Sequence, residues 1–116
     1  MREVLERYFA AMRAHDWPAL AETLADDVHR TGPFLDQVHG KQAYVGFLAR
    51  VVPALRNYAL DVARIRALEG GGALVELSES MDRDGGRRTY PEALLFGFDA
   101  AGRIARVDIF IKQPPD

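Results

Sequence analysis

The sequence predicts an α+β domain in which three helices cover one face of an antiparallel β-sheet. Apolar residues recur with a helical period in the first half of the chain, and from Tyr58 onward they alternate with a period of two. Turn sequences that contain glycine divide this second half into segments of strand length. Because a sheet must bury one of its faces, the helices are expected to cover it.

The composition fits one globular domain, residues 1–116, and excludes several kinds of chemistry. Apolar residues make up 48% and charged residues 28% of the 116 positions, as in ordinary globular proteins. A net charge of −2 argues against nucleic acid or a membrane surface as a partner. The absence of cysteine excludes disulfides and thiolate chemistry. No apolar run reaches the roughly 20 residues that span a bilayer, and MREVLERYFA lacks a signal-peptide core, so a cytoplasmic location is expected.

Three helices are expected before Tyr58. The first covers residues 2–15, and its apolar stripe is formed by Val4, Leu5, Tyr8, Phe9 and Met12. Asp16 is a suitable cap for a second helix, which Asp26-Asp27 should end. The sequence VHRTG then predicts a short strand. A third helix begins at Gly40 and is limited by Pro53, and its apolar face carries Tyr44, Phe47, Leu48, Val51 and Val52.

The second half predicts an antiparallel meander of four strands. Their sequences are YALDVARIRAL, ALVELSESM, TYPEALLFGF and RIARVDIFIK. A two-residue hairpin turn at Gly85-Gly86 or at Asp84-Gly85 joins the middle pair, and DAAG joins the last pair. A four-residue DAAG turn pairs Leu94 with Val107 and Glu92 with Ile109.

Glu92 is the unusual residue of this sheet, because alternation along TYPEALLFGF places its carboxylate on the apolar face. A turn at Gly85-Gly86 pairs Glu79 directly with Glu92, whereas a turn at Asp84-Gly85 makes them diagonal neighbours on the same face. Pro91 could instead mark a bulge, and a bulge would turn Glu92 outward. The register therefore decides whether two carboxylates share one apolar face.

If they share it, the two carboxyl groups cannot easily both ionise, so one is expected to stay protonated near neutral pH. A carboxyl group with a raised pKa can donate or accept a proton in catalysis. Tyr8 could add a hydroxyl donor to the same cavity. The alternative is structural: the glutamates reach solvent or pair with Arg30, Arg64 or Arg88.

The catalytic candidates are therefore Glu92, Glu79 and Tyr8. The expected lining of the pocket comprises Trp17, Phe34, Phe47, Leu77, Leu94, Phe96, Val107 and Ile109. The three histidines have no carboxylate at a ligand spacing, so neither a metal nor another cofactor is expected.

Three stretches that together cover almost the whole chain match a known superfamily: LERYFAAMRAHDWPALAETLADDV, HGKQAYVGFL and YPEALLFGFDAAGRIARVDIF. They resemble the nuclear transport factor 2-like superfamily, and its SnoaL-like and ketosteroid-isomerase-like branches in particular. The resemblance implies a single SnoaL-like domain, a cone-shaped, cystatin-like fold whose curved sheet and helices enclose a pocket and which commonly forms dimers. Members include isomerases, cyclases, dehydratases, epoxide hydrolases and proteins without a known reaction, so the fold alone does not indicate the function.

The resemblance can be tested residue by residue. Ketosteroid isomerases use an aspartate base together with a tyrosine and a protonated aspartate as hydrogen-bond donors. Tyr8 matches the tyrosine, but Gly32 stands at the position of the base and Leu94 at that of the second donor, so steroid isomerisation is not expected. SnoaL-like cyclases carry an acidic residue on the last strand, and the nearest here, Asp108, is expected to face away from the pocket. The Asp-Arg-Asp set of epoxide hydrolases is not recognisable.

Three functions follow from these observations. The first is a cofactor-independent isomerase, cyclase or dehydratase that moves a proton on a hydrophobic carbonyl or polycyclic substrate. The second is a domain that binds a hydrophobic ligand without turnover, and the third is a dimeric association domain. A homodimer is expected through the outer sheet face, where Arg106 and Asp108 interrupt an apolar surface formed by Ala93, Leu95, Ile104 and Phe110.

Overall fold

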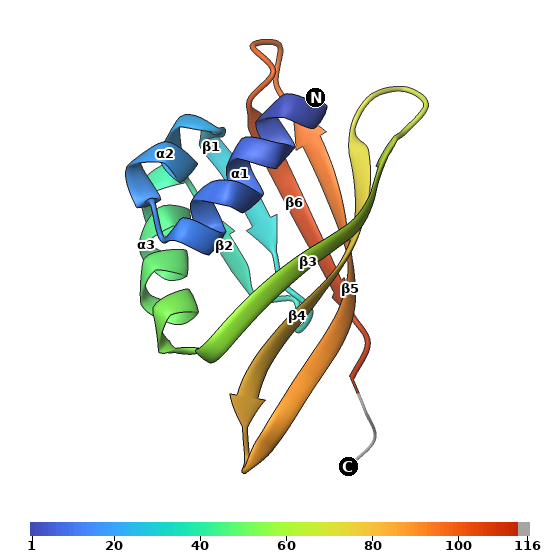
Figure 1. Ribbon diagram of the computed structural model, residues 1–116. Helices are drawn as coiled ribbons and strands as arrows, with labels where there is room; N and C mark the ends of the chain where they lie inside the picture. Colours follow the sequence, from blue (N-terminus) through green and yellow to red (C-terminus); the bar gives the residue numbers. More distant parts are fainter. Residues whose placement is uncertain (114–116) are drawn as a thin grey trace.

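The computed structural model describes residues 1–113 and shows a six-stranded sheet curved around three helices (Figure 1). The prediction of an α+β fold is confirmed. The elements are α1 (Arg2–Ala14), α2 (Trp17–Glu22), β1 (Leu24–Thr31), β2 (Gln37–His39), α3 (Lys41–Val51), the 3-10 turn η1 (Val52–Ala54), β3 (Arg56–Ala67), β4 (Ala73–Arg83), β5 (Gly86–Phe98) and β6 (Ile104–Ile111).

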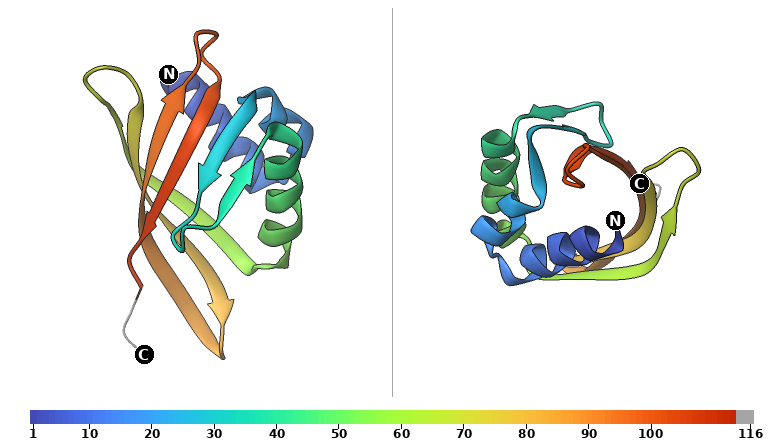
Figure 2. Two further views of the ribbon diagram at one scale, coloured as in Figure 1. Left: turned by 180° about the vertical axis from the view of Figure 1, so that it is seen from behind. Right: turned by 90° about the horizontal axis from the view of Figure 1, so that it is seen from above.

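The strands follow the order β2-β1-β6-β5-β4-β3, and the sheet is curved without closing into a barrel (Figure 2). Strands β3 to β6 form the predicted antiparallel meander. The pairing of β1 with β6 is parallel, which the prediction of a purely antiparallel sheet missed. This parallel pair places β1 between β2 and β6, where it contacts α2 and α3.

The first two helices begin as predicted, but the second ends earlier. Asp16 caps α2 by accepting a hydrogen bond of 3.1 Å from the amide of Ala19. The helix ends at Glu22 because the Thr23 side chain is buried and donates to the Leu20 carbonyl over 2.7 Å. Asp26 and Asp27 therefore lie in β1 and not at a helix end. Strand β2 was not predicted. None of the helices within residues 1–113 is long and apolar enough to cross a membrane.

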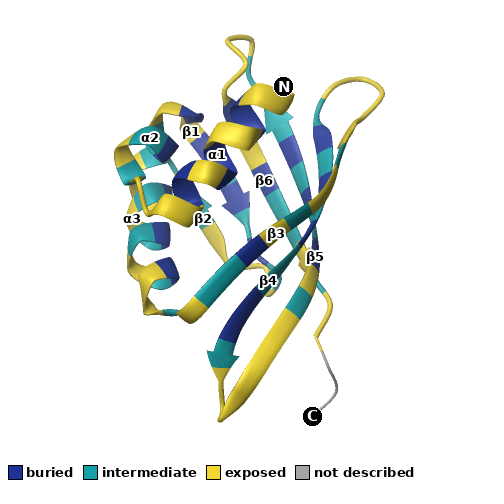
Figure 3. Cartoon of the chain, in the orientation of Figure 1, coloured by how far each residue is buried: buried dark blue, intermediate teal, exposed yellow. Residues whose placement is uncertain are grey.

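The core lies between the inner stripe of α1 and the concave face of the sheet (Figure 3). The stripe predicted for the first helix is buried throughout. Tyr8, Phe9 and Phe96 pack edge to face, with ring centroids 5.2 to 6.0 Å apart. Such pairs add about 0.5–1.5 kcal/mol to the gain from burial. This aromatic cluster joins α1 to β5, the strand that carries Glu92.

The hairpin between β4 and β5 decides the position of Glu92. Its turn is Asp84-Gly85, whose φ angles of 52° and 78° are those that a type I′ turn requires. Glu92 therefore pairs with Leu77, and Glu79 pairs with Tyr90. The ladder continues without interruption through Pro91, so no bulge turns Glu92 outward. The two glutamates are diagonal neighbours, the second of the two predicted registers.

The register between β5 and β6 differs from the prediction by two residues. Leu94 pairs with Ile109 instead of Val107, and Glu92 pairs with Ile111. The loop between the two strands holds five residues, 99–103. Because this number is odd, Ile104 faces the opposite side of the sheet from the side predicted, and a bulge at Gly97/Phe98 restores the predicted facing for the rest of β6. Ile104 is consequently fully buried, so its predicted place on the outer face is wrong.

Candidate active site

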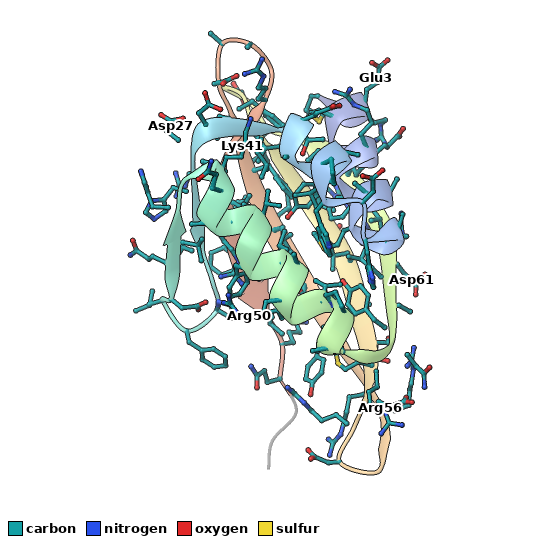
Figure 4. The ribbon with its side chains drawn as sticks, turned by 90° about the vertical axis from the view of Figure 1, so that its left-hand side faces the viewer. Glu3, Asp27, Lys41, Arg50, Arg56 and Asp61 are labelled. Carbon is teal, nitrogen blue, oxygen red and sulfur yellow. The ribbon has the colours of Figure 1, made fainter. Side chains whose placement is uncertain are left out.

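A cavity of about 140 Å³ lies between the helices and the concave face of the sheet. Its apolar walls come from α1, α3, η1 and the strands β3 to β6, and polar atoms come from Tyr8, Arg30, Tyr44, Glu79 and Glu92. The exposed carboxylates of Glu3, Asp27 and Asp61 point away from the body of the molecule (Figure 4). A larger hollow of about 460 Å³ lies at the β4–β5 turn, but arginine, aspartate and glycine residues line it without an apolar wall. The cavity between the helices and the sheet is therefore the stronger candidate for a site.

Two carboxyl groups meet at the sheet side of the cavity. Glu92 is 8% exposed, and its carboxyl group is within hydrogen-bond reach of Glu79. Burial, and to a smaller extent the hydrogen bond and charge of Glu79, raise the pKa of Glu92 to about 10. The Tyr58 hydroxyl donates to Oε2 of Glu79. Glu92 therefore keeps its proton at neutral pH, and the Tyr58 hydroxyl holds the Glu79 side chain in place.

Two tyrosines contribute the polar atoms on the helical side of the cavity. The hydroxyl oxygens of Tyr8 on α1 and Tyr44 on α3 are 2.6 Å apart, and both side chains are almost completely buried. Burial raises the pKa of Tyr8 and that of Tyr44, so both remain neutral hydroxyls. Either can donate to the other, and only one of the two hydroxyl hydrogens is used in this contact. The second hydrogen is available to a ligand oxygen.

Arg30 on β1 brings a cation to the same cavity. It is 8% exposed, its guanidinium carbon lies 4.5 Å from the centre of the Phe47 ring, and its Nη1 donates to Oδ2 of Asp36 over 2.9 Å. This hydrogen bond is the main reason why the pKa of Asp36 is lowered. A β-carbon at Gly32 would lie 2.3 Å from Oδ1 of Asp36. Glycine at this position therefore leaves the room in which Asp36 reaches Arg30.

The structure brings together most of the residues expected at the site. Glu92, Glu79 and Tyr8 line the cavity, as do Phe47, Leu77, Leu94 and Ile109. The catalytic roles of the first three remain predictions.

Four residues of the expected lining lie elsewhere. Phe96 and Val107 are buried in the core beyond the cavity wall, and Trp17 stacks on His15 with ring centroids 5.7 Å apart. Phe34 is 76% exposed, because the loop after β1 turns back at Gly32 and leaves the ring outside. The structure does not place these four side chains in the lining of the cavity.

Three polar residues of the site were missed. Tyr44 was assigned only to an apolar helix face, Tyr58 only to a strand, and Arg30 only as a partner for the glutamates. One signal was present in the sequence for Arg30, because it follows the buried Val28 by two positions and so shares its face of β1. The hydroxyl contacts of the two tyrosines depend on how the helices cross the sheet and carry no such signal.

Comparisons with known proteins agree with this architecture. The family model of the SnoaL-like domain matches residues 5–107. No curated protein sequence matches the chain. One similar solved structure is the epoxide hydrolase/cyclase-like enzyme SalBIII, which has a role in pyran ring formation in the polyether salinomycin; it is 19% identical, the match covers 97% of this chain and 90% of that one, and the TM-score is 0.82. A second is an LEH-like epoxide hydrolase from M. tuberculosis, with 18% identity, coverage of 95% and 80%, and a TM-score of 0.78. A third is a protein of ketosteroid isomerase-like fold from Catenulispora acidiphila in complex with trimethylamine, with 16% identity, coverage of 93% and 84%, and a TM-score of 0.80. At these identities the likeness establishes the fold alone. By the match of its family model, the chain belongs to the SnoaL-like domain family.

Proposed function

We propose that this protein is a cofactor-independent enzyme of the isomerase or lyase type, which transfers a proton on a small and largely apolar carbonyl compound. The observation that carries this proposal is the carboxyl pair formed by the buried Glu92 and the partly exposed Glu79 in a largely apolar cavity. A carboxyl group that its surroundings keep protonated at neutral pH can act as a general acid. An exposed glutamate cannot, because it has already lost its proton at this pH.

The geometry supports the following sequence of events. The substrate carbonyl oxygen accepts the free hydroxyl hydrogen of the Tyr8–Tyr44 pair, which orients and polarises the carbonyl group. Glu92 then delivers its proton to the substrate. Its new carboxylate is buried beside Glu79, and this destabilisation of its charge makes it a strong base that removes a proton from a neighbouring carbon. The enzyme returns to its starting state, and one hydrogen of the substrate has moved.

A lyase would use the same groups. If the proton of Glu92 goes to a hydroxyl group of the substrate, that group leaves as water. The base formed by this step then takes the proton that the carbon gives up. In both reactions the protein supplies acid, base and hydroxyl donors from its own side chains.

The size of the cavity limits the substrate. Its volume of about 140 Å³ is close to that of an engineered cavity, about 150 Å³, known to hold one benzene molecule. This supports a substrate, or a reacting part of one, about the size of a single ring, in preference to a polycyclic compound. The pyran-forming enzyme and the epoxide hydrolase among the structural relatives are consistent with chemistry on small oxygen-containing groups.

The alternative is a domain that binds a hydrophobic ligand without turnover. In that case the glutamates are expected to be neutralised by arginines. Among residues 1–113, the ion pairs do not include Glu79 or Glu92, and the hydroxyl that binds Glu79 comes from Tyr58. The carboxyl pair thus stays chemically available, which favours the enzyme.

The experiment is a screen of small cyclic ketones and enones in deuterated buffer. NMR spectroscopy detects isomerisation of the compound or exchange of the hydrogens next to its carbonyl group. For a compound that reacts, Glu92→Gln is expected to lower the rate by about 10²–10⁴-fold, the usual contribution of a general acid or base. Glu76→Gln, a change on the outer face of β4, is the matched control and should leave the rate unchanged. Equal rates for wild type and Glu92→Gln would overturn the proposal.

A further inference from the structure

Arg30 has a hydrogen-bond donor that the protein itself does not use. The guanidinium group is fixed on two sides, by Asp36 at Nη1 and by the ring of Phe47 beneath its plane. Its Nε is buried and finds no acceptor among the described residues. An unsatisfied buried donor on a charged group is costly, so a functional reason for it is expected.

Asp36, the ion-pair partner of Arg30, is not among the residues that line the cavity. The Asp36 side chain is 47% exposed, and solvent screens much of its charge. Arg30 lines the cavity together with Tyr8, Tyr44 and Glu92, whose pKa values are all raised, so each of these three side chains is neutral. Glu79, which Tyr58 binds, is the remaining carboxyl group of the lining. The cavity is therefore lined by a buried cation and two neutral hydroxyl groups, which a ligand that enters it can contact.

We propose that the cavity binds a small carboxylate, with Arg30 holding the carboxylate oxygen and the apolar part of the ligand lying against Leu77 and Leu94. A carboxylate next to Arg30 accepts charge-assisted hydrogen bonds from the guanidinium group, whose ion-pair partner Asp36 is not among the residues that line the cavity. The proposal rests on the proposed function for the reaction and adds its substrate class. The substrate is then an oxo acid of about one ring in size, whose carboxylate binds Arg30 and whose carbonyl group faces the tyrosine pair.

The test compares two probes of the same shape, benzoate and the neutral benzamide, which are titrated into the full chain by NMR spectroscopy. We expect benzoate to bind at least about tenfold more tightly, since a hydrogen bond to a charged group contributes at least that much. Benzoate should also shift the Nε–H resonance of Arg30. Equal affinity for the two probes would overturn the proposal.

Two arginines in contact with the same ring provide matched variants. Arg30→Met is expected to lose the preference for benzoate. Arg50→Met is expected to retain it, because Arg50 is exposed, lies 5.8 Å from the centre of the Phe47 ring and is absent from the lining of the cavity (Figure 4). An unchanged preference in Arg30→Met would contradict the proposal.

A variant on the partner of Arg30 keeps the test decisive if Arg30→Met does not fold. Asp36→Asn leaves the cation in place and removes the carboxylate that shares its charge, so benzoate should bind as tightly as to wild type or more tightly. Loss of benzoate binding in this variant would count against the proposal.

Glu92→Gln separates the two proposals, because it should lose proton transfer and keep the preference for benzoate. If the protein turns over a substrate but shows no preference for benzoate, only the carboxylate site is refuted. If it prefers benzoate but turns over no substrate, only the proposed enzymatic function is refuted.

Discussion

Replacing Glu92 by glutamine should change how the stability of the protein depends on pH. The folded-state pKa of Glu92 is raised, mainly by burial, whereas in the unfolded chain a glutamate has a pKa of about 4.3. Between these two values the folded state holds one proton more than the unfolded state. Wild type therefore loses up to about 1.4 kcal/mol of stability from this group for each pH unit above the unfolded value. The loss stops once the pH exceeds the folded pKa.

Glutamine keeps the shape of the side chain and has no proton to lose, so the difference between the two proteins isolates this effect. From pH 6 to pH 8 the free energy of unfolding of Glu92→Gln should rise by about 2–3 kcal/mol relative to wild type. This is the loss of about 1.4 kcal/mol per pH unit taken over two pH units. Contributions of the histidines cancel in the difference. Urea unfolding curves at pH 6, 7 and 8 measure it, with Glu76→Gln as the control that should show no trend. A pH-independent difference would refute a protonated Glu92 in the folded state.

Three further predictions concern the surroundings of the cavity and the outer face. Tyr58→Phe removes the hydroxyl that donates to Glu79 and should cost about 1–3 kcal/mol in urea unfolding, and unchanged stability would contradict that contact. Gly32→Ala places a methyl group where the Asp36 carboxylate lies, so NMR should show altered Arg30 side-chain resonances, and identical spectra would contradict the packing. We also propose a two-fold dimer through the outer face. Phe110, which is 57% exposed, should be essential to it, so Phe110→Lys should give monomers by light scattering, and a monomeric wild type would refute the dimer.

Much of the fold followed from local patterns in the sequence. The inner stripe of α1, the Asp16 cap and the change of period at Tyr58 each depend on neighbouring residues, and each was predictable. The parallel pairing of β1 with β6 joins segments far apart in the chain and has no local signature. The side of the sheet that Ile104 faces depends on a loop with an odd number of residues and on the bulge beside it. Alternation alone placed Ile104 on the wrong face.

The candidate site was predictable on its sheet side and not on its helical side. Glu92 and Glu79 were found because strand alternation fixes a face, and both possible turns kept them together. The contact between Tyr8 and Tyr44 depends on the distance between two helices, which periodicity does not determine. Phe34 was misplaced because its loop has no period, and its direction is set by a backbone turn.

The protonation state of Glu92 is the central claim, and its side-chain carboxyl carbon reports it directly. In a ¹³C NMR titration of protein labelled at glutamate side chains, the resonance missing from Glu92→Gln identifies this group. We predict that it keeps the chemical shift of a protonated carboxyl through pH 7 and titrates only above neutrality, as its burial beside Glu79 requires. A midpoint near the ordinary value of about 4.3 would show an ionised glutamate and contradict the proton-transfer function.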